Sequence, residues 1–182
     1  MDGGRIAVWL AVLILGSRGA EAQYRAEVFA GPVVARIHDG LGNAAVGGFN
    51  LGIGIGISGQ SLLVGPEVLL LSGGARRVRA FDLAIRLRQR AGAVHPHLMA
   101  SIGAYAWEAA PTLVLPEFVV VGAAEWRETD DFTGSIGAGV TVGGLASRLS
   151  GVVEGRWHRS LSQNASGSRS LSTLAAGLRV SW

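Results

Sequence analysis

His158 and Ser160 are the pair of residues in this sequence most suited to nucleophilic chemistry. They stand two positions apart, and on an extended strand such side chains project from the same face, together with Glu154. A histidine beside a serine can act as a base that activates the hydroxyl, and a carboxylate can orient that histidine. One alternative function is therefore a hydrolase whose catalytic residues are His158, Ser160 and Glu154.

His95 and His97 form a second candidate pair with the same spacing. Two imidazoles on one face could bind a metal ion, but a zinc site uses three or four protein ligands, and no third ligand stands near this pair. The sequence also has no cysteine, which excludes thiolate metal sites and disulfide bonds. We therefore expect no metal ion and no cofactor, and we interpret both histidines as polar residues at a rim of the fold.

The elements that carry these residues are predicted from the alternation of apolar and polar side chains. In residues 48–58 (GFNLGIGIGIS), every second residue from Phe49 to Ile57 is apolar, which predicts a β-strand with one apolar face. Gly31-Pro32 is expected to insert a bulge into the first strand and to exchange its faces partway. Eight strands are predicted, at residues 24–37, 48–58, 62–71, 77–88, 95–107, 132–142, 149–158 and 171–182.

Composition and strand length together indicate one membrane barrel. The chain has 182 residues, of which 49% are hydrophobic and only 16% charged, whereas soluble domains have about 25% charged residues. Tilted strands of about 9–11 residues cross a bilayer. We predict an all-β fold: a single closed antiparallel up-and-down transmembrane β-barrel of about eight strands, with the apolar faces toward lipid. A soluble lipocalin-like barrel, with its apolar faces inward, is the alternative.

Residues 1–22 have the pattern of a cleaved signal peptide. Arg5 precedes an apolar run at residues 6–15, and Ala20-Glu21-Ala22 provides a small-x-small cleavage site. The run is too short for a transmembrane helix, which needs about 20 apolar residues. We predict cleavage after Ala22, so that residues 23–182 form the outer-membrane β-barrel domain. An uncleaved membrane anchor is the alternative.

Charged residues on the polar faces of the predicted strands are expected to lie inside the barrel. Buried charges are costly unless they are paired, so we interpret the set as a salt-bridge network that fills the lumen, with inward glycines making room for long side chains. A narrow small-solute pore, in which the pairs exchange partners, is the alternative. The predicted lumen residues are Glu67, Asp82, Arg86, Arg88, Glu154, Arg156 and Arg179. Because the basic residues, all arginines, are spread along the chain, we expect no nucleic-acid partner.

The connections between the predicted strands are short in one series, at residues 59–61, 89–94 and 143–148. The other series is longer overall, at residues 38–47, 108–131 and 159–170, with residues 72–76 as a short exception. Outer-membrane barrels have short periplasmic turns and longer outer loops, so we expect both termini in the periplasm. Residues 108–131 include an apolar stretch, 113–122, which could bind an extracellular ligand. The alternative, which we favour, is that this segment extends the hairpin above the membrane.

Aromatic residues near the strand ends are expected to form the girdle of the two membrane interfaces. They are Tyr24, Tyr105, Trp107, Phe132, Trp157 and Trp182.

Three passages resemble the small eight-stranded outer-membrane barrel family represented by the OmpA transmembrane domain and OmpX. They are residues 95–105, 134–142 and 177–182. In the last, Gly177, Val180 and Trp182 resemble the signal read by the barrel-assembly machinery, although Ala175 stands where a polar residue is usual. The resemblance implies an outer-membrane protein in contact with outer-membrane lipid, with a non-enzymatic role in envelope structure or in surface interaction through extracellular loops.

The segment His158-Arg159-Ser160 also resembles the His-x-Ser motif of lipid A deacylase barrels, which would imply a lipid esterase. Two features depart from that family's pattern. Leu161 occupies the position after the serine, where those enzymes have asparagine, and residues 171–182 lack the acid expected on the last strand. A lipid A deacylase is therefore the enzymatic alternative to a non-enzymatic barrel.

Overall fold

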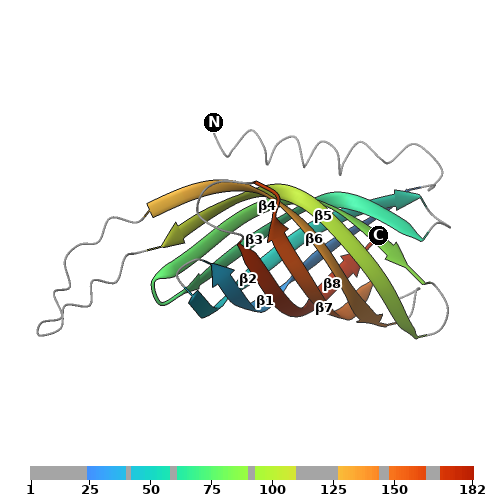
Figure 1. The fold of residues 1–182 in the computed structure, drawn as a ribbon. Coiled ribbons are helices and arrows are strands. Elements are labelled where there is room, and N and C mark those ends of the chain that lie inside the picture. The colour runs from blue at the N-terminus through green and yellow to red at the C-terminus, as the bar shows by residue number, and fades with distance from the viewer. Residues whose placement is uncertain are drawn as a thin grey trace, which may run out of the picture.

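The computed structural model describes residues 24–39, 42–57, 61–89, 93–109, 127–143, 148–162 and 169–182. Eight antiparallel strands form a closed barrel, in which each strand pairs with the next and β8 pairs with β1 (Figure 1). The predicted fold class is thus confirmed. The strands are β1 (Tyr24–Asp39), β2 (Gly42–Ile57), β3 (Leu62–Gly73), β4 (Arg76–Arg88), β5 (Val94–Ala109), β6 (Arg127–Val142), β7 (Leu149–Ser160) and β8 (Ser170–Ser181).

The two ends of this barrel differ in their connections. Tyr24 and Trp182 lie at one end, where Ala26 and Trp182 exchange backbone hydrogen bonds at 3.2 and 3.1 Å. We call it the turn end, and we call the opposite end, where β1 meets β2 and β5 meets β6, the loop end. The predicted signal peptide, residues 1–22, lies outside the described residues. Among the described residues, no helix is long and apolar enough to cross a membrane.

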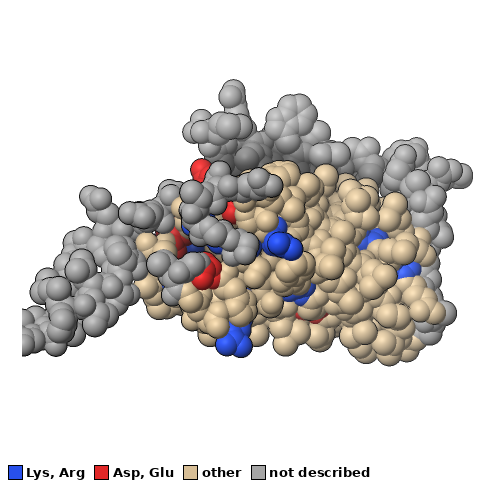
Figure 2. Space-filling model, viewed as in Figure 1, with Lys and Arg blue, Asp and Glu red and all other residues tan. Residues whose placement is uncertain are grey.

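Strict alternation of side chains gives the barrel an apolar exterior and a polar interior. On β4, Phe81, Leu83 and Ile85 are about half exposed on the outer wall, whereas Asp82 and Arg86 are buried inside. The same alternation holds on the other strands, and the face in Figure 2 shows only a few separate charged patches. A soluble barrel would have the opposite arrangement, so the lipocalin-like alternative is wrong, and the apolar belt is the surface that a membrane barrel presents to lipid.

β1 contains no bulge, which corrects the sequence-based expectation at Gly31-Pro32. Its register with β8 has the same offset at Ala30↔Leu178 and at Val33↔Ala175, so no residue is inserted between these pairs. A Cβ atom at Gly31 would collide with the carbonyl oxygen of Ala176 on β8. The glycine therefore permits a close approach of two backbones rather than a change of face.

Strands at the loop end extend further than predicted. β1 continues to Asp39 and β2 begins at Gly42, so most of the predicted loop 38–47 is paired strand. β5 and β6 also extend to the pair Ala109↔Arg127, which confirms the hairpin extension for both ends of the segment 108–131. Its apolar stretch, residues 113–122, lies outside the described residues.

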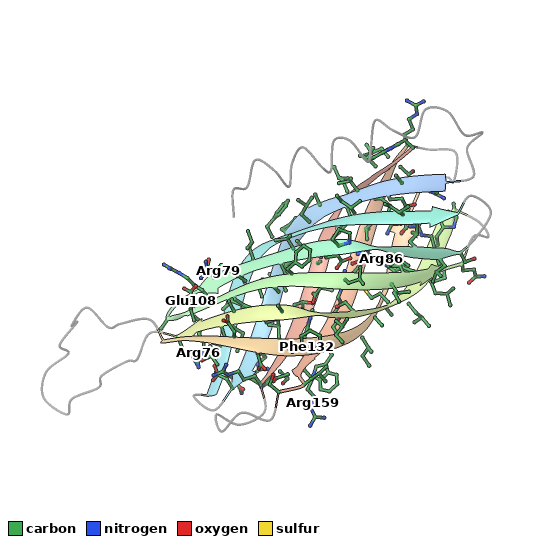
Figure 3. The ribbon with its side chains drawn as sticks, turned by 90° about the horizontal axis from the view of Figure 1, so that it is seen from above. Arg76, Arg79, Arg86, Glu108, Phe132 and Arg159 are labelled. Atoms are coloured by element: carbon green, nitrogen blue, oxygen red, sulfur yellow. The ribbon has the colours of Figure 1, made fainter. Side chains whose placement is uncertain are left out.

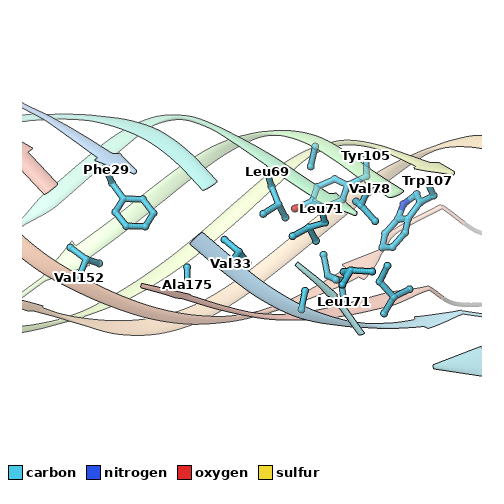
Figure 4. Packing of buried hydrophobic residues seen from close by; sticks show 14 residues of the cluster. Phe29, Val33, Leu69, Leu71, Val78, Tyr105, Trp107, Val152, Leu171 and Ala175 are labelled. Atoms are coloured by element: carbon cyan, nitrogen blue, oxygen red, sulfur yellow. The ribbon is translucent and has the colours of Figure 1, made fainter. Parts of the chain in front are cut away.

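The lumen is divided into an apolar layer near the loop end and a polar region toward the turn end. Figure 4 shows the apolar layer, in which Leu71, Val78 and Trp107 face Leu171 across the barrel. We call this layer the apolar plug; its members, all buried, are Ile37, Val46, Leu71, Val78, Trp107 and Leu171. It lies across the lumen between the loop end and the buried charges of the polar region.

Candidate functional site

Glu154 is the centre of a buried ion-pair cluster that we call the central network. Its Oε1 atom accepts hydrogen bonds from His97 Nε2 at 3.0 Å and Arg86 Nε at 3.3 Å, and its Oε2 atom accepts one from Arg156 Nη2 at 2.8 Å. Glu67 pairs with the same two arginines from the opposite wall. Two carboxylates thus hold two guanidinium groups and one imidazole, all nearly inaccessible to solvent.

A second cluster around Glu27 lies nearer the turn end. Arg88 makes a bidentate pair with this carboxylate, one bond being 2.9 Å, and Arg25 Nε lies 3.0 Å from its Oε1 atom. Arg179 joins the two clusters, because its Nε lies 3.3 Å from Glu27 Oε2 and its Nη2 lies 3.9 Å from Glu154 Oε1. The two clusters are therefore one connected set of ion pairs.

Tyr105 connects two further polar residues on the loop-end side of the central network. Its hydroxyl donates to Asp82 Oδ2 at 2.7 Å and lies 2.7 Å from His158 Nδ1, which can donate to it. His158 Nε2 is 3.2 Å from the hydroxyl of Thr173. The chain of contacts fixes the ring of His158 inside the barrel with both nitrogens occupied.

Glycines on the inner wall make room for these long side chains. A Cβ atom at Gly139 would lie 2.9 Å from Glu154 Cγ and 2.7 Å from His97 Nε2, and a Cβ atom at Gly137 would lie 2.8 Å from Arg156 Cγ. All three distances are shorter than packed side chains allow. The glycine-rich sequence of β6 therefore positions the central network by giving it space.

All seven predicted lumen residues lie in the interior, and Figure 3 shows Arg86 there, whereas Arg79 and Arg159 point away from the barrel. Prediction from the sequence missed Glu27, because the expected bulge left the faces of β1 undefined. The regular spacing of Glu27, Phe29, Val33 and Ile37 is the signal that could have identified it. His95 and His97 are both buried: His95 lies at the turn end, where its Nε2 is 3.2 Å from the carbonyl oxygen of Gly143, whereas His97 contacts Glu154 and is not a rim residue.

Two of the predicted interface aromatics were wrong. Tyr105 and Trp107 are buried in the lumen, because the odd-numbered residues of β5 face inward. Phe132, Trp157 and Trp182 are about half exposed on the outer wall, where a girdle would lie. The side chain of Tyr24 lies outside what the structure describes.

Neither a protein-family model nor a curated protein matches this sequence. Among solved structures, the barrel is similar to Neisserial surface protein A, with a TM-score of 0.68 and 14% identity over 85% of this chain and 96% of that one. It is also similar to the N-terminal β-barrel domain of OprF from Pseudomonas aeruginosa, with a TM-score of 0.51 and 9% identity over 88% and 98% of the two chains. The chain has the fold of a small eight-stranded outer-membrane barrel.

The barrel does not assemble the hydrolase proposed from His158, Ser160 and Glu154. Ser160 Oγ donates to the carbonyl oxygen of Ser162 at 3.4 Å, and both nitrogens of His158 are engaged by Tyr105 and Thr173. Glu154 contacts His97 and the arginines. Within the described residues, no hydrogen bond joins any two of the three. The arrangement of these side chains therefore does not support the hydrolase alternative.

The interior is also too well filled for an open pore. The described part of the lumen contains a cavity of about 10 Å³, lined by Asn50, Asp82, His158 and their neighbours, which is about the space that one water molecule needs. The apolar plug lies between this cavity and the loop end. Within the described strands, no group of three histidine or acidic residues could hold a metal ion.

Replacing Tyr105 with phenylalanine is expected to destabilise the folded barrel by about 1–3 kcal/mol, because it leaves the buried carboxylate of Asp82 and a nitrogen of His158 without a partner. The free energy of unfolding in urea, measured on protein refolded into detergent, tests this expectation. Replacing the half-exposed Phe132 with leucine on the outer wall is the matched control, and it should change stability much less. A Tyr105→Phe variant as stable as the unmodified protein would contradict the bridging role of the hydroxyl.

Proposed function

We propose that the chain is an integral outer-membrane protein with a non-enzymatic role, serving envelope structure or surface contact through its loop end. One observation carries the proposal: the outer wall is an apolar belt, whereas the charges of the central network are paired inside a lumen that the apolar plug covers toward the loop end. A barrel built this way is stable in lipid. It has little internal space for transport, and its histidine and serine are not arranged for hydrolysis.

Ion pairs between strands stabilise the loop end, where the connecting segments leave the barrel. Asp39 on β1 accepts two hydrogen bonds from Arg76 on β4, at 2.9 and 3.0 Å, across the mouth of the barrel. Glu108 on β5 pairs with Arg79 on β4. These contacts join three strands where the connecting segments leave the barrel. We propose that this end faces outward from the cell, with both termini in the periplasm, and that segment 108–131 is the first place to look for an extracellular ligand.

Cysteine labelling on intact Gram-negative cells tests location and orientation together, since the sequence contains no native cysteine. Ala75→Cys, in the β3–β4 turn at the loop end, should react with a membrane-impermeant maleimide on intact cells. Gln89→Cys, exposed at the turn end, is the matched control and should react only after lysis. The protein should fractionate with outer membranes and migrate differently with and without boiling. Labelling of Gln89→Cys alone would reverse the orientation, and absence from outer membranes would overturn the proposed function.

A further inference from the structure

The outward-facing arginines of the described strands all lie in the loop-end half of the barrel. They are Arg36 on β1, Arg77 and Arg79 on β4, and Arg159 on β7. Arg77 and Arg79 lie near Glu108. Arg36 and Arg159 are exposed, and neither has an ion-pair partner among the residues that the structure describes. These two charges therefore remain available at the edge of the apolar belt.

Strand register places Arg36 and Arg159 on either side of β8. Arg36 pairs with Ser172, and Ser172 pairs with Trp157. One row nearer the loop end, Arg159 pairs with Ser170. Adjacent strands are about 4.8 Å apart and two residues along a strand span about 6.7 Å, so the two arginine Cα atoms lie about 12 Å apart. Between them β8 presents two short serine side chains, over which both guanidinium groups can converge.

The surface immediately below these rows is apolar and recessed. Val34 and Leu174 are more than half exposed in the next row, where Leu174 pairs with Gly155. A Cβ atom at Gly155 would meet only Thr173 O, at 3.9 Å, so this position is open. It adjoins a groove of about 810 Å³ lined mainly by outward residues of β4 to β7, including Leu98, Ala138 and Val153.

We propose that Arg36, Arg159 and the serines of β8 bind a phosphate group of an outer-leaflet lipid, with one of its acyl chains lying over Leu174 and Gly155. Guanidinium groups bind phosphate through paired, charge-assisted hydrogen bonds, and serine hydroxyls can add further donors. Trp157 borders the site, as aromatic residues do at a membrane interface. The adjacency of phosphate donors and an apolar recess favours a phosphate that carries acyl chains, such as that of diphosphoryl lipid A, over a soluble phosphate. The inference rests on the proposed function, because it requires the loop end to face the outer leaflet.

Native mass spectrometry of the full barrel, refolded in detergent and titrated with diphosphoryl lipid A, tests the proposal. The double variant Arg36→Gln/Arg159→Gln should bind lipid A at least about tenfold more weakly, because both charge-assisted contacts to the phosphate are lost. Arg79→Gln, also exposed but near Glu108, is the matched control and should bind within about twofold of the unmodified protein. Gly155→Leu, which fills the recess, should also weaken binding.

Any of four results would overturn the proposal. The first is unchanged lipid A binding by the double variant, and the second is an equal loss in Arg79→Gln, which would indicate diffuse attraction to charge. The third is displacement of lipid A by inorganic phosphate, which would indicate an ion site. The mobility shift on unboiled gels shows separately whether each variant is folded. The fourth result, an unmodified protein that folds and inserts but does not bind lipid A, would remove this site and leave the proposed function intact.

Discussion

The Glu154→Gln variant is expected to lose about 3–5 kcal/mol of folding free energy, because breaking a buried ion pair leaves uncompensated charges in a medium that solvates them poorly. Glu154 accepts hydrogen bonds from His97, Arg86 and Arg156. After the substitution, Glu67 alone would face the two arginines of the central network. The amide keeps the shape of the side chain, so the loss of folding free energy would result from the removed charge and not from a change in volume.

Urea unfolding of the refolded barrel, followed by the mobility of unboiled protein on gels, measures this effect. Glu108→Gln is the matched control: it removes a carboxylate of the same size from a pair whose partner, Arg79, is 59% exposed on the outer wall. Exposed ion pairs contribute about 0–1 kcal/mol, so this control should remain close to the unmodified protein. Equal stability of the two variants would show that the central network does not hold the barrel together.

The Leu83→Arg variant is expected to lose about 2–4 kcal/mol in a bilayer, since that is the cost of an arginine on the lipid face of a barrel near the membrane midplane. Leu83 is 52% exposed and lies between Phe81 and Ile85 in the middle of the belt. If the outer wall met water, a substitution at so exposed a position would change stability by only about 0.5 kcal/mol. The size of the stability loss in Leu83→Arg therefore distinguishes a membrane barrel from a soluble one.

Folding into lipid vesicles, titrated with urea, measures the loss for Leu83→Arg. Leu83→Phe retains an apolar side chain at the same position and serves as the control, with stability expected close to that of the unmodified barrel. Arg79 already lies on the outer wall near the loop end, which indicates that an arginine is tolerated at that depth. A stable Leu83→Arg variant in vesicles would contradict the assignment of this wall to lipid.

The faces of the strands were predictable from the sequence because alternation is a local property. Asp82, Arg86 and Glu154 follow the period of two on their own strands, and the structure places all three inside. The partners of these charges were not predictable in the same way. Glu154 and Arg86 are 68 residues apart, and Arg156 and Glu67 are 89 apart. Such contacts depend on the register and closure of the whole barrel, which no short segment encodes.

The incorrect expectations arose where residue type was given more weight than alternation. The aromatic character of Trp107 and Tyr105 predicts an interface position, but their odd positions on β5 direct them inward. Gly31-Pro32 predicts a bulge because both residues commonly interrupt strands. The reason for Gly31, its contact with the β8 backbone, is visible only once β1 and β8 are neighbours.

The distribution of the paired charges over the chain bears on how the protein enters a membrane. Arg86 on β4 finds its acceptors on β3 and β7, and Arg179 on β8 is needed to join them to Glu27 on β1. A sheet of the first four strands, placed in hydrocarbon by itself, would carry Arg86 without one of its two counter-ions. We therefore expect insertion and closure to occur as one concerted event, with half-built barrels held outside the bilayer until the last strand has met the first.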